Sequence, residues 1–233
     1  MSAIDFSRFD ALTFDCYGTL IDWEQGILNA LQPALAPHRI EATADELLEL
    51  YASHEAALEA GAYLRYRDVL TGSLRGLCGD LGFEPTDGDA REFSQSVGNW
   101  PAFHDTAPAL HRLGGRFKLG VITNCDDDLF ARSNERLGVT FDWIVTAEQA
   151  QCYKPSLVPF ELAFATIGVP RDRILHVAQS LYHDHVPAQQ LGLTTVWVDR
   201  RQDRPGFGAT PAASATPDLT VPDMQTLAAV ALG

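Results

Sequence analysis

Basic residues are scarce in this chain, where 17 Lys and Arg stand against 31 Asp and Glu among 233 residues. The formal net charge is therefore −14. A protein that binds nucleic acid neutralises a row of phosphates with Lys and Arg, so we expect no nucleic-acid partner here. The charge balance does not exclude a small anionic ligand, because one local positive group is enough to hold one.

Long apolar runs and metal-binding cysteine patterns are also missing. No stretch approaches the ~18 apolar residues of a membrane span, and no basic start is followed by an apolar run as in a signal peptide. The 4 cysteines fit no zinc spacing, and Cys16, Cys125 and Cys152 flank candidate site residues. We therefore expect a soluble, cytoplasmic protein with no membrane partner, whose cysteines are reduced and fill apolar space.

What the chain does have is a regular alternation of apolar segments and helical patterns after residue 100. This alternation predicts a parallel sheet covered on both faces by helices. The length suits one domain with an insertion or two small domains. The predicted strands are residues 9–14, 117–123, 143–145, 174–178 and 194–198, with 219–221 as an edge strand. The predicted helices of this part are residues 106–114, 127–137, 159–167, 184–191 and 224–232, and residues 200–217 are a predicted loop.

The block from residue 23 to residue 96 differs, because its apolar residues recur at helical spacing and no convincing strand appears. Its predicted helices are residues 24–35, 43–60, 63–81 and 86–97. We therefore predict an α/β fold in two domains. A Rossmann-like parallel sheet core spans residues 1–20 and 101–233, and an all-helical cap domain, residues 21–100, is inserted after the first strand.

Asp15 lies where the first predicted strand ends, three positions before Gly18, which with Thr19 forms a predicted turn. The carboxyl ends of parallel strands are where open α/β sheets bind ligands. A carboxylate there can act as a nucleophile and form a covalent ester. An Asp that only caps a turn is the alternative.

Polar residues also follow the other predicted strands. Thr123 and Asn124 follow the second strand, Lys154 lies in the loop after the third, and residues 179–184 follow the fourth. These loops can meet at one edge of the sheet. There a hydroxyl and an amide could hold an oxyanion, a lysine could balance carboxylates, and a second Asp could orient water.

In that order and at those strand ends, the set closely resembles the haloacid dehalogenase superfamily, and the helical insert sits where that superfamily places a cap. The resemblance implies that Asp15 is the nucleophile and that Thr19 and Thr123 support it. It also implies that Lys154 orients and neutralises Asp15 and that Asp184 is the terminal acidic residue.

Two departures point away from the phosphatases of that superfamily. Tyr17 stands where they place a second Asp, and its unperturbed pKa of ~10 makes it a poor base near neutrality. Gln179 stands where they place the first of two acidic residues that help to hold Mg²⁺, a cation that prefers several oxygen ligands. Both features resemble the L-2-haloacid dehalogenase branch, which works without a metal. In that branch the nucleophile displaces a halide, and water near the terminal Asp then hydrolyses the ester.

The resemblance implies no cofactor and a small carboxylate substrate, with a homodimer as one option. The candidate substrate-binding residues are Cys16, Tyr17, Thr123, Asn124, Gln179, Ser180, Arg65 and Phe160. The branch carries an Arg in the cap, yet residues 49–55 contain none, so Arg65 or Arg67 is the candidate replacement. Phe160 stands where the branch has a Tyr, and Gln179 and Leu181 stand where it has Ser and Asn. These changes leave the substrate open.

Two other functions therefore stay open: a Mg²⁺-dependent phosphatase acting on a small phosphate ester, and a binding protein of the same fold without turnover. His183 and His185 flank Asp184 without a third ligand at metal-binding spacing, so we expect them to make supporting hydrogen bonds. Residues 126–128 are three successive Asp, and we expect them to cap the helix that follows.

Overall fold

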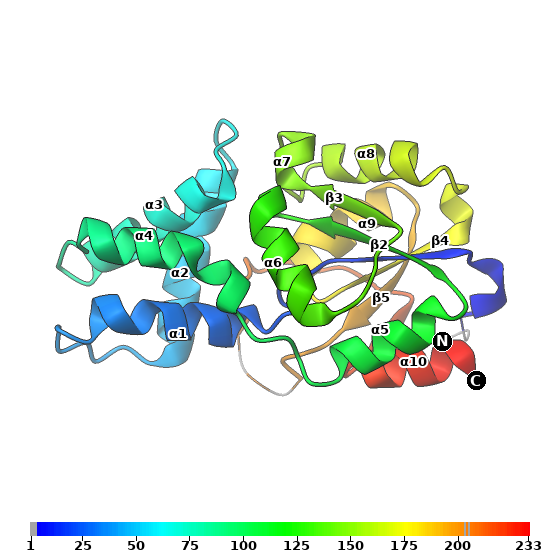
Figure 1. The fold of residues 1–233 in the computed structure, drawn as a ribbon, viewed down its shortest axis with the longest axis horizontal. Coiled ribbons are helices and arrows are strands. Elements are labelled where there is room, and N and C mark those ends of the chain that lie inside the picture. Colours follow the sequence, from blue (N-terminus) through cyan, green and yellow to red (C-terminus); the bar gives the residue numbers. More distant parts are fainter. Residues whose placement is uncertain (1–3, 203, 205) are drawn as a thin grey trace.

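A six-stranded parallel sheet forms the centre of the protein (Figure 1), as the alternating pattern predicts. The computed structural model describes residues 4–202, 204 and 206–233. The strand order is β3-β2-β1-β4-β5-β6, and all five strand pairs are parallel. The strands are β1 (Ala11–Phe14), β2 (Lys118–Thr123), β3 (Trp143–Thr146), β4 (Ile174–Ala178), β5 (Thr194–Val198) and β6 (Leu219–Val221).

Helices cover both faces of this sheet. Successive side chains of a strand point to opposite faces. Accordingly, Leu12 and Phe14 of β1 belong to the main core cluster, which includes residues of α5 (Thr106–Gly114), α6 (Asp127–Leu137) and α10 (Met224–Leu232). Ala11 belongs to a second core cluster, which includes residues of α8 (Val158–Ile167) and α9 (Val186–Gln190). Both faces are therefore buried, as the continuous apolar strands require. A short helix, α7 (Ala147–Ala150), follows β3.

Four further helices follow β1 and lie to one side of the sheet in Figure 1, beyond the carboxyl end of β1. They are α1 (Trp23–Leu35), α2 (Ala44–Glu59), α3 (Tyr66–Asp80) and α4 (Asp87–Gln95). Capping boxes start α2 at Thr43 and α4 at Thr86. The predicted all-helical insertion is therefore confirmed, and below we call these helices the cap.

The chain enters and leaves the cap along two segments that lie side by side. Ile21 and Ala102 form an antiparallel bridge, and the Asp22 amide donates to the Pro101 carbonyl at 2.8 Å. A Cβ on Gly26 would lie 2.3 Å from the Trp100 ring, so only glycine lets α1 approach this crossing. The predicted boundaries at residues 20 and 101 fall on this crossing, while the division into two domains stays a prediction.

The structure differs from the predicted helices at two places that matter for the site. Helix α3 begins at Tyr66 rather than at residue 63, because Asp126 of the core accepts hydrogen bonds from the Tyr66 and Arg67 amides (2.8 and 3.2 Å). Asp126 therefore caps α3 of the cap, and its side chain does not cap α6 as we expected. The predicted helix at 184–191 instead starts with a π-helical turn, Leu181–His185, before α9.

The segment predicted as a loop, residues 200–217, contains no helix or strand in its described part, and residues 203 and 205 lie outside the description. Within the described ranges, no helix is long and apolar enough to cross a bilayer.

Candidate active site

The loop after β1 holds Asp15 in a fixed position at the sheet edge. Gly18 has a φ of 93°, a conformation that suits glycine, and its amide donates to the Ile21 carbonyl at 2.8 Å. This tight turn brings the Thr19 hydroxyl to 2.6 Å from Asp15 Oδ2. Because the Gln179 amide donates to Thr19 Oγ1 at 2.9 Å, the Thr19 proton is directed to Asp15.

Lys154 lies between the two carboxylates that the resemblance assigns to catalysis. Its Nζ is 2.9 Å from Asp15 Oδ1, 2.8 Å from Asp184 Oδ1 and 2.9 Å from the Ile122 carbonyl. An ammonium group has three protons, so all three are used. Burial opposes the charge, but the two carboxylates outweigh it and raise the pKa of Lys154. Lys154 is therefore a fully engaged cation.

Asp184 is oriented by a chain of buried hydrogen bonds. His176 Nε2 lies 3.0 Å from Asp184 Oδ1, and Thr13 Oγ1 lies 2.9 Å from His176 Nδ1. Burial opposes ionisation of Asp184, yet Lys154 and His176 hold its pKa well below the usual range. Asp184 Oδ2 is buried and accepts no hydrogen bond within the described residues, so it is free to accept one from a water or a ligand.

Asp15 has a different electrostatic balance from Asp184. Burial raises its pKa above the ordinary value, the Lys154 charge opposes that rise, and the Asp184 charge adds to it. A single cation thus serves two carboxylates. The hydrogen bond from Thr19 fixes the direction of the Asp15 carboxyl group.

These residues line a small pocket between the core and the cap, with a cavity volume of about 20 Å³. A cavity of that size holds little more than one water molecule, so the walls fit closely around the Asp15 carboxyl. The lining residues are Asp15, Tyr17, Trp23, Glu55, Glu59, Tyr66, Asn124, Lys154, Ser180, His183 and Asp184.

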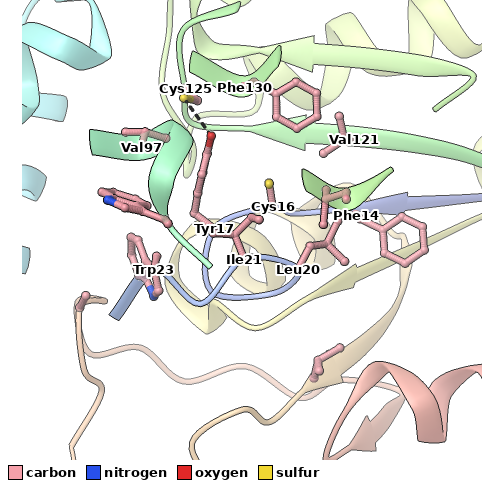
Figure 2. Packing of buried hydrophobic residues seen from close by; sticks show 14 of the residues in the cluster. Phe14, Cys16, Tyr17, Leu20, Ile21, Trp23, Val97, Val121, Cys125 and Phe130 are labelled. Carbon is pink, nitrogen blue, oxygen red and sulfur yellow. Dashed lines mark hydrogen bonds between the residues drawn. The ribbon is translucent and has the colours of Figure 1, made fainter. Parts of the chain in front are cut away.

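Tyr17 lines this pocket, but its hydroxyl is directed into the core. The hydroxyl oxygen lies 3.0 Å from Ser133 Oγ and accepts a hydrogen bond from Cys125 Sγ at 3.4 Å. Figure 2 shows Tyr17 reaching from the loop toward Cys125. Burial raises the pKa of Tyr17 well above its usual value. Tyr17 is therefore a wall of the pocket and does not replace an acidic catalyst.

Of the other predicted substrate-binding residues, Asn124 and Ser180 reach the pocket. Asn124 exchanges hydrogen bonds with the Lys154 backbone, at 2.8 and 3.0 Å, which fixes the loop that carries the lysine. Ser180 accepts from the His183 amide at 2.9 Å and caps the π-helical turn that carries Asp184.

The remaining predicted substrate-binding residues lie elsewhere. Cys16 is buried in the main core (Figure 2), and Phe160 is buried in the second core cluster, 5.3 Å from the His176 ring. Arg65 is half exposed and pairs with Glu148. Thr123 and Gln179 end strands beside the site without lining the pocket, and a polar oxygen of each is buried without a partner among the described residues.

Cys16, Phe160 and Arg65 therefore do not line this pocket, because packing inside the core and an ion pair at the surface occupy their side chains, and their part in substrate binding stays a prediction. Arg67, the other candidate for the missing cap arginine, pairs with Asp126 and Asp128. No cap arginine of the described chain reaches the pocket.

The sequence reasoning missed the cap wall of the pocket, which consists of Glu55, Glu59 and Tyr66 with Trp23 beside them. Glu55 accepts hydrogen bonds from the Tyr51 and Tyr66 hydroxyls at 2.7 and 2.8 Å. A signal was present, because the two glutamates lie one helical turn apart on the face of α2 that carries Tyr51.

His176 was also missed as a site residue, and His183 was expected only to make supporting hydrogen bonds. His176 orients Asp184 from within β4, and nothing in a buried strand of apolar residues distinguishes such a histidine before the fold is known. His183 lines the pocket 3.9 Å from Glu59. Burial lowers its pKa to about 4, so the ring is neutral near neutral pH. Among the described residues, no group of three or more His, Cys, Asp or Glu could hold a metal ion.

Comparison with known proteins finds dehalogenases among the proteins that this chain resembles. The chain is 25% identical over 197 residues to an (S)-2-haloacid dehalogenase of Pseudomonas fluorescens, covering 81% of this chain and 83% of that protein. It is 25% identical over 226 residues to the haloacetate dehalogenase H-2 of Moraxella sp. (strain B), covering 94% and 96%.

Solved structures show the same fold. The L-2-haloacid dehalogenase of Xanthobacter autotrophicus superposes with a TM-score of 0.80 at 20% identity, covering 97% of this chain and 99% of that one. The family model of the haloacid dehalogenase-like hydrolases matches residues 9–184. This chain belongs to the haloacid dehalogenase-like hydrolases.

Proposed function

We propose that the protein displaces halide from a small 2-haloalkanoic acid through an ester on Asp15, without a metal. The observation that supports this most is the geometry of Asp15, whose two oxygens are held by Thr19 and Lys154 at the pocket wall. The dehalogenases among the relatives act on substrates of this class by name.

In the first step an Asp15 oxygen attacks the carbon that carries the halogen. The new C–O bond forms as the C–X bond breaks, and the halide leaves with the bonding electron pair. A halide leaving group needs no proton, which fits a site where the Tyr17 hydroxyl is turned into the core.

In the second step a water attacks the carbonyl carbon of the Asp15 ester. The free oxygen of Asp184 accepts a hydrogen bond from that water and orients it. One water proton ends on the hydroxyl of the released 2-hydroxy acid, and the other leaves to solvent as Asp15 returns to its carboxylate. Lys154 stabilises the negative charge that develops on the ester oxygen.

The alternative of a Mg²⁺-dependent phosphatase does not fit these donors. Tyr17 replaces one expected carboxylate, and its hydroxyl is held in the core by Ser133 and Cys125. The Lys154 ammonium occupies the space between Asp15 and Asp184.

The experiment is halide release from 2-chloropropionate, 2-bromopropionate and fluoroacetate with EDTA present. The parent should release halide in stoichiometry with the 2-hydroxy acid. Asp15→Asn should release none above background, and Asp172→Asn, at an exposed position, should match the parent. If the parent released halide from none of these acids but released phosphate from small esters when Mg²⁺ is added, the phosphatase would be supported instead.

A binding protein without turnover would bind these acids equally well after Asp15→Asn, with no product from the parent. The cytoplasmic location, the absence of a nucleic-acid partner and the homodimer stay predictions.

A further inference from the structure

A haloalkanoate is an anion, and no Lys or Arg that lines the pocket in the described chain is free to pair with its carboxylate. Lys154 already donates its three protons to Asp15, Asp184 and the Ile122 carbonyl. No other Lys or Arg of the described chain lines the pocket. The carboxylate of the substrate must therefore be recognised by neutral hydrogen-bond donors.

The cap wall carries two carboxyl groups, and each has one oxygen that accepts hydrogen bonds and one that has no partner among the described residues. Glu55 accepts from the Tyr51 and Tyr66 hydroxyls on Oε1 alone, and Glu59 accepts from Asn124 Nδ2 on Oε2 alone, at 3.3 Å. The second oxygen of each makes no hydrogen bond with the described residues, although both side chains line the pocket. The second oxygen of each group is therefore available to carry a proton and donate it to a ligand.

The surroundings of the two groups favour that neutral form. Burial raises the pKa of Glu55 to about 7, and burial together with the Glu55 charge raises the pKa of Glu59 well above its usual value. Lys154 opposes this rise at Glu59. The other titratable groups that face Glu59 are His183, which is neutral, and the hydroxyls of Tyr51 and Tyr153.

We propose that Glu59, with Glu55 one helical turn before it, binds the carboxylate of the substrate as a neutral carboxylic acid that donates a hydrogen bond. The inference rests on the proposed function, because only an anionic substrate requires these groups to be neutral. If both were ionised, four carboxylates would surround one lysine, and an incoming carboxylate would be repelled.

Glu59 also lines a second hollow. This hollow is formed together with Lys154 and residues 60–61, 152–153, 155–156 and 182, and Glu59 and Lys154 line the inner pocket as well. A substrate that reached Asp15 through this hollow would pass Glu59.

The first test is the pH dependence of KM for 2-chloropropionate between pH 5 and pH 9. In the parent, KM should rise about tenfold for each pH unit above the pKa of the donor, because one proton must be present for binding. Glu59→Gln, which keeps a donor at every pH, should hold KM near the low-pH value of the parent throughout. Glu49→Gln, an exposed change on the same helix, should follow the parent.

The second test needs neither turnover nor a variant. Propionate has the carboxylate and no leaving group, and its binding to the parent is measured by calorimetry at pH 8.5 in two buffers of different ionisation enthalpy. We expect uptake of about one proton for each propionate bound. At pH 5.5, where the donors are already protonated, uptake should fall toward zero.

The two proposals fail in different ways. Halide release with a KM that is flat with pH, or that falls as pH rises, contradicts the inference and leaves the dehalogenation intact. So does a preference for neutral 2-chloropropionamide over 2-chloropropionate, or an absence of propionate binding. Binding of propionate with proton uptake but no halide release supports the inference and removes the dehalogenation.

Discussion

The pocket has two walls of opposite character. On the core wall Lys154 pairs with both Asp15 and Asp184, at 2.9 and 2.8 Å; it holds the pKa of Asp184 well below its usual range despite burial, and it opposes the rise that burial causes in the pKa of Asp15. On the cap wall Glu55 and Glu59 meet hydroxyl and amide donors and pair with no Lys or Arg of the described chain. The difference teaches that burial alone does not fix the pKa of a carboxyl group: a cation in contact lowers it, whereas neutral donors do not offset the rise that burial causes.

The largest effect is expected from a substitution that removes the cation of the core wall. Lys154→Met leaves Asp15 and Asp184 buried without their cation, which should cost about 3–5 kcal/mol of unfolding free energy at pH 7. Turnover should fall by at least about 10³-fold, since residues that act as a unit lose nearly everything together. Urea unfolding and halide release measure the two effects.

The matched control for that variant is Lys118→Met. Lys118 is paired with Asp142 but is mostly exposed, so its loss should cost less than about 1 kcal/mol. Equal destabilisation by the two variants would contradict the distinct role of Lys154.

A smaller effect is expected in the pH dependence of stability, which should differ between the two walls. The folded protein holds the Glu55 proton up to about pH 7, whereas the unfolded chain releases it near 4.5. The stability that Glu55 contributes is thus present below pH 4.5 and is lost as the pH rises to 7. Glu55→Gln removes this loss, so its melting temperature relative to the parent should increase between pH 4.5 and 7 and then level off. The expected gain at pH 7.5 is of order 1–3 kcal/mol.

Asp184 on the core wall should show the opposite trend, since its pKa is held low. Its stabilising contribution is present above the ordinary carboxyl range and is lost as the pH falls below it. A Glu55→Gln difference that shrinks with rising pH would mean that Glu55 is ionised in the folded state.

The smallest effect concerns Tyr17, whose ring forms part of the pocket but whose hydroxyl bonds to Ser133 and Cys125. Tyr17→Phe should lower the unfolding free energy by about 1 kcal/mol. Its effect on kcat should stay well below the ~10²-fold that loss of a general acid or base costs. Thermal unfolding and steady-state kinetics decide this, and a 10²-fold loss of kcat would show that the hydroxyl takes part in catalysis.

The core wall could be predicted from the sequence because its residues follow strands. Buried strands are visible as short apolar segments, and parallel strands place their carboxyl ends together, so Asp15, Lys154 and Asp184 converge for any chain with this order. The strand pattern and the all-helical cap were predictable on the same physical basis.

The cap wall could not be predicted in the same way. Which face of α2 meets the core depends on how the cap is set against the sheet, through contacts such as Asp126 with the first turn of α3. Those contacts join residues about 60 positions apart and have no local signature. For that reason Arg65 was a candidate from its position in the chain, whereas the folded protein uses it in a surface pair with Glu148.

The most direct test of the account is a single turnover in H₂¹⁸O with the enzyme in excess over 2-chloropropionate. If Asp15 forms the ester and water attacks its carbonyl carbon, one ¹⁸O enters the Asp15 carboxylate. The peptide that contains Asp15 should then be 2 Da heavier, and the 2-hydroxypropionate should be unlabelled. Label in the hydroxyl of the product, with an unchanged Asp15 peptide, would show that water attacks the substrate directly and would contradict the central claim.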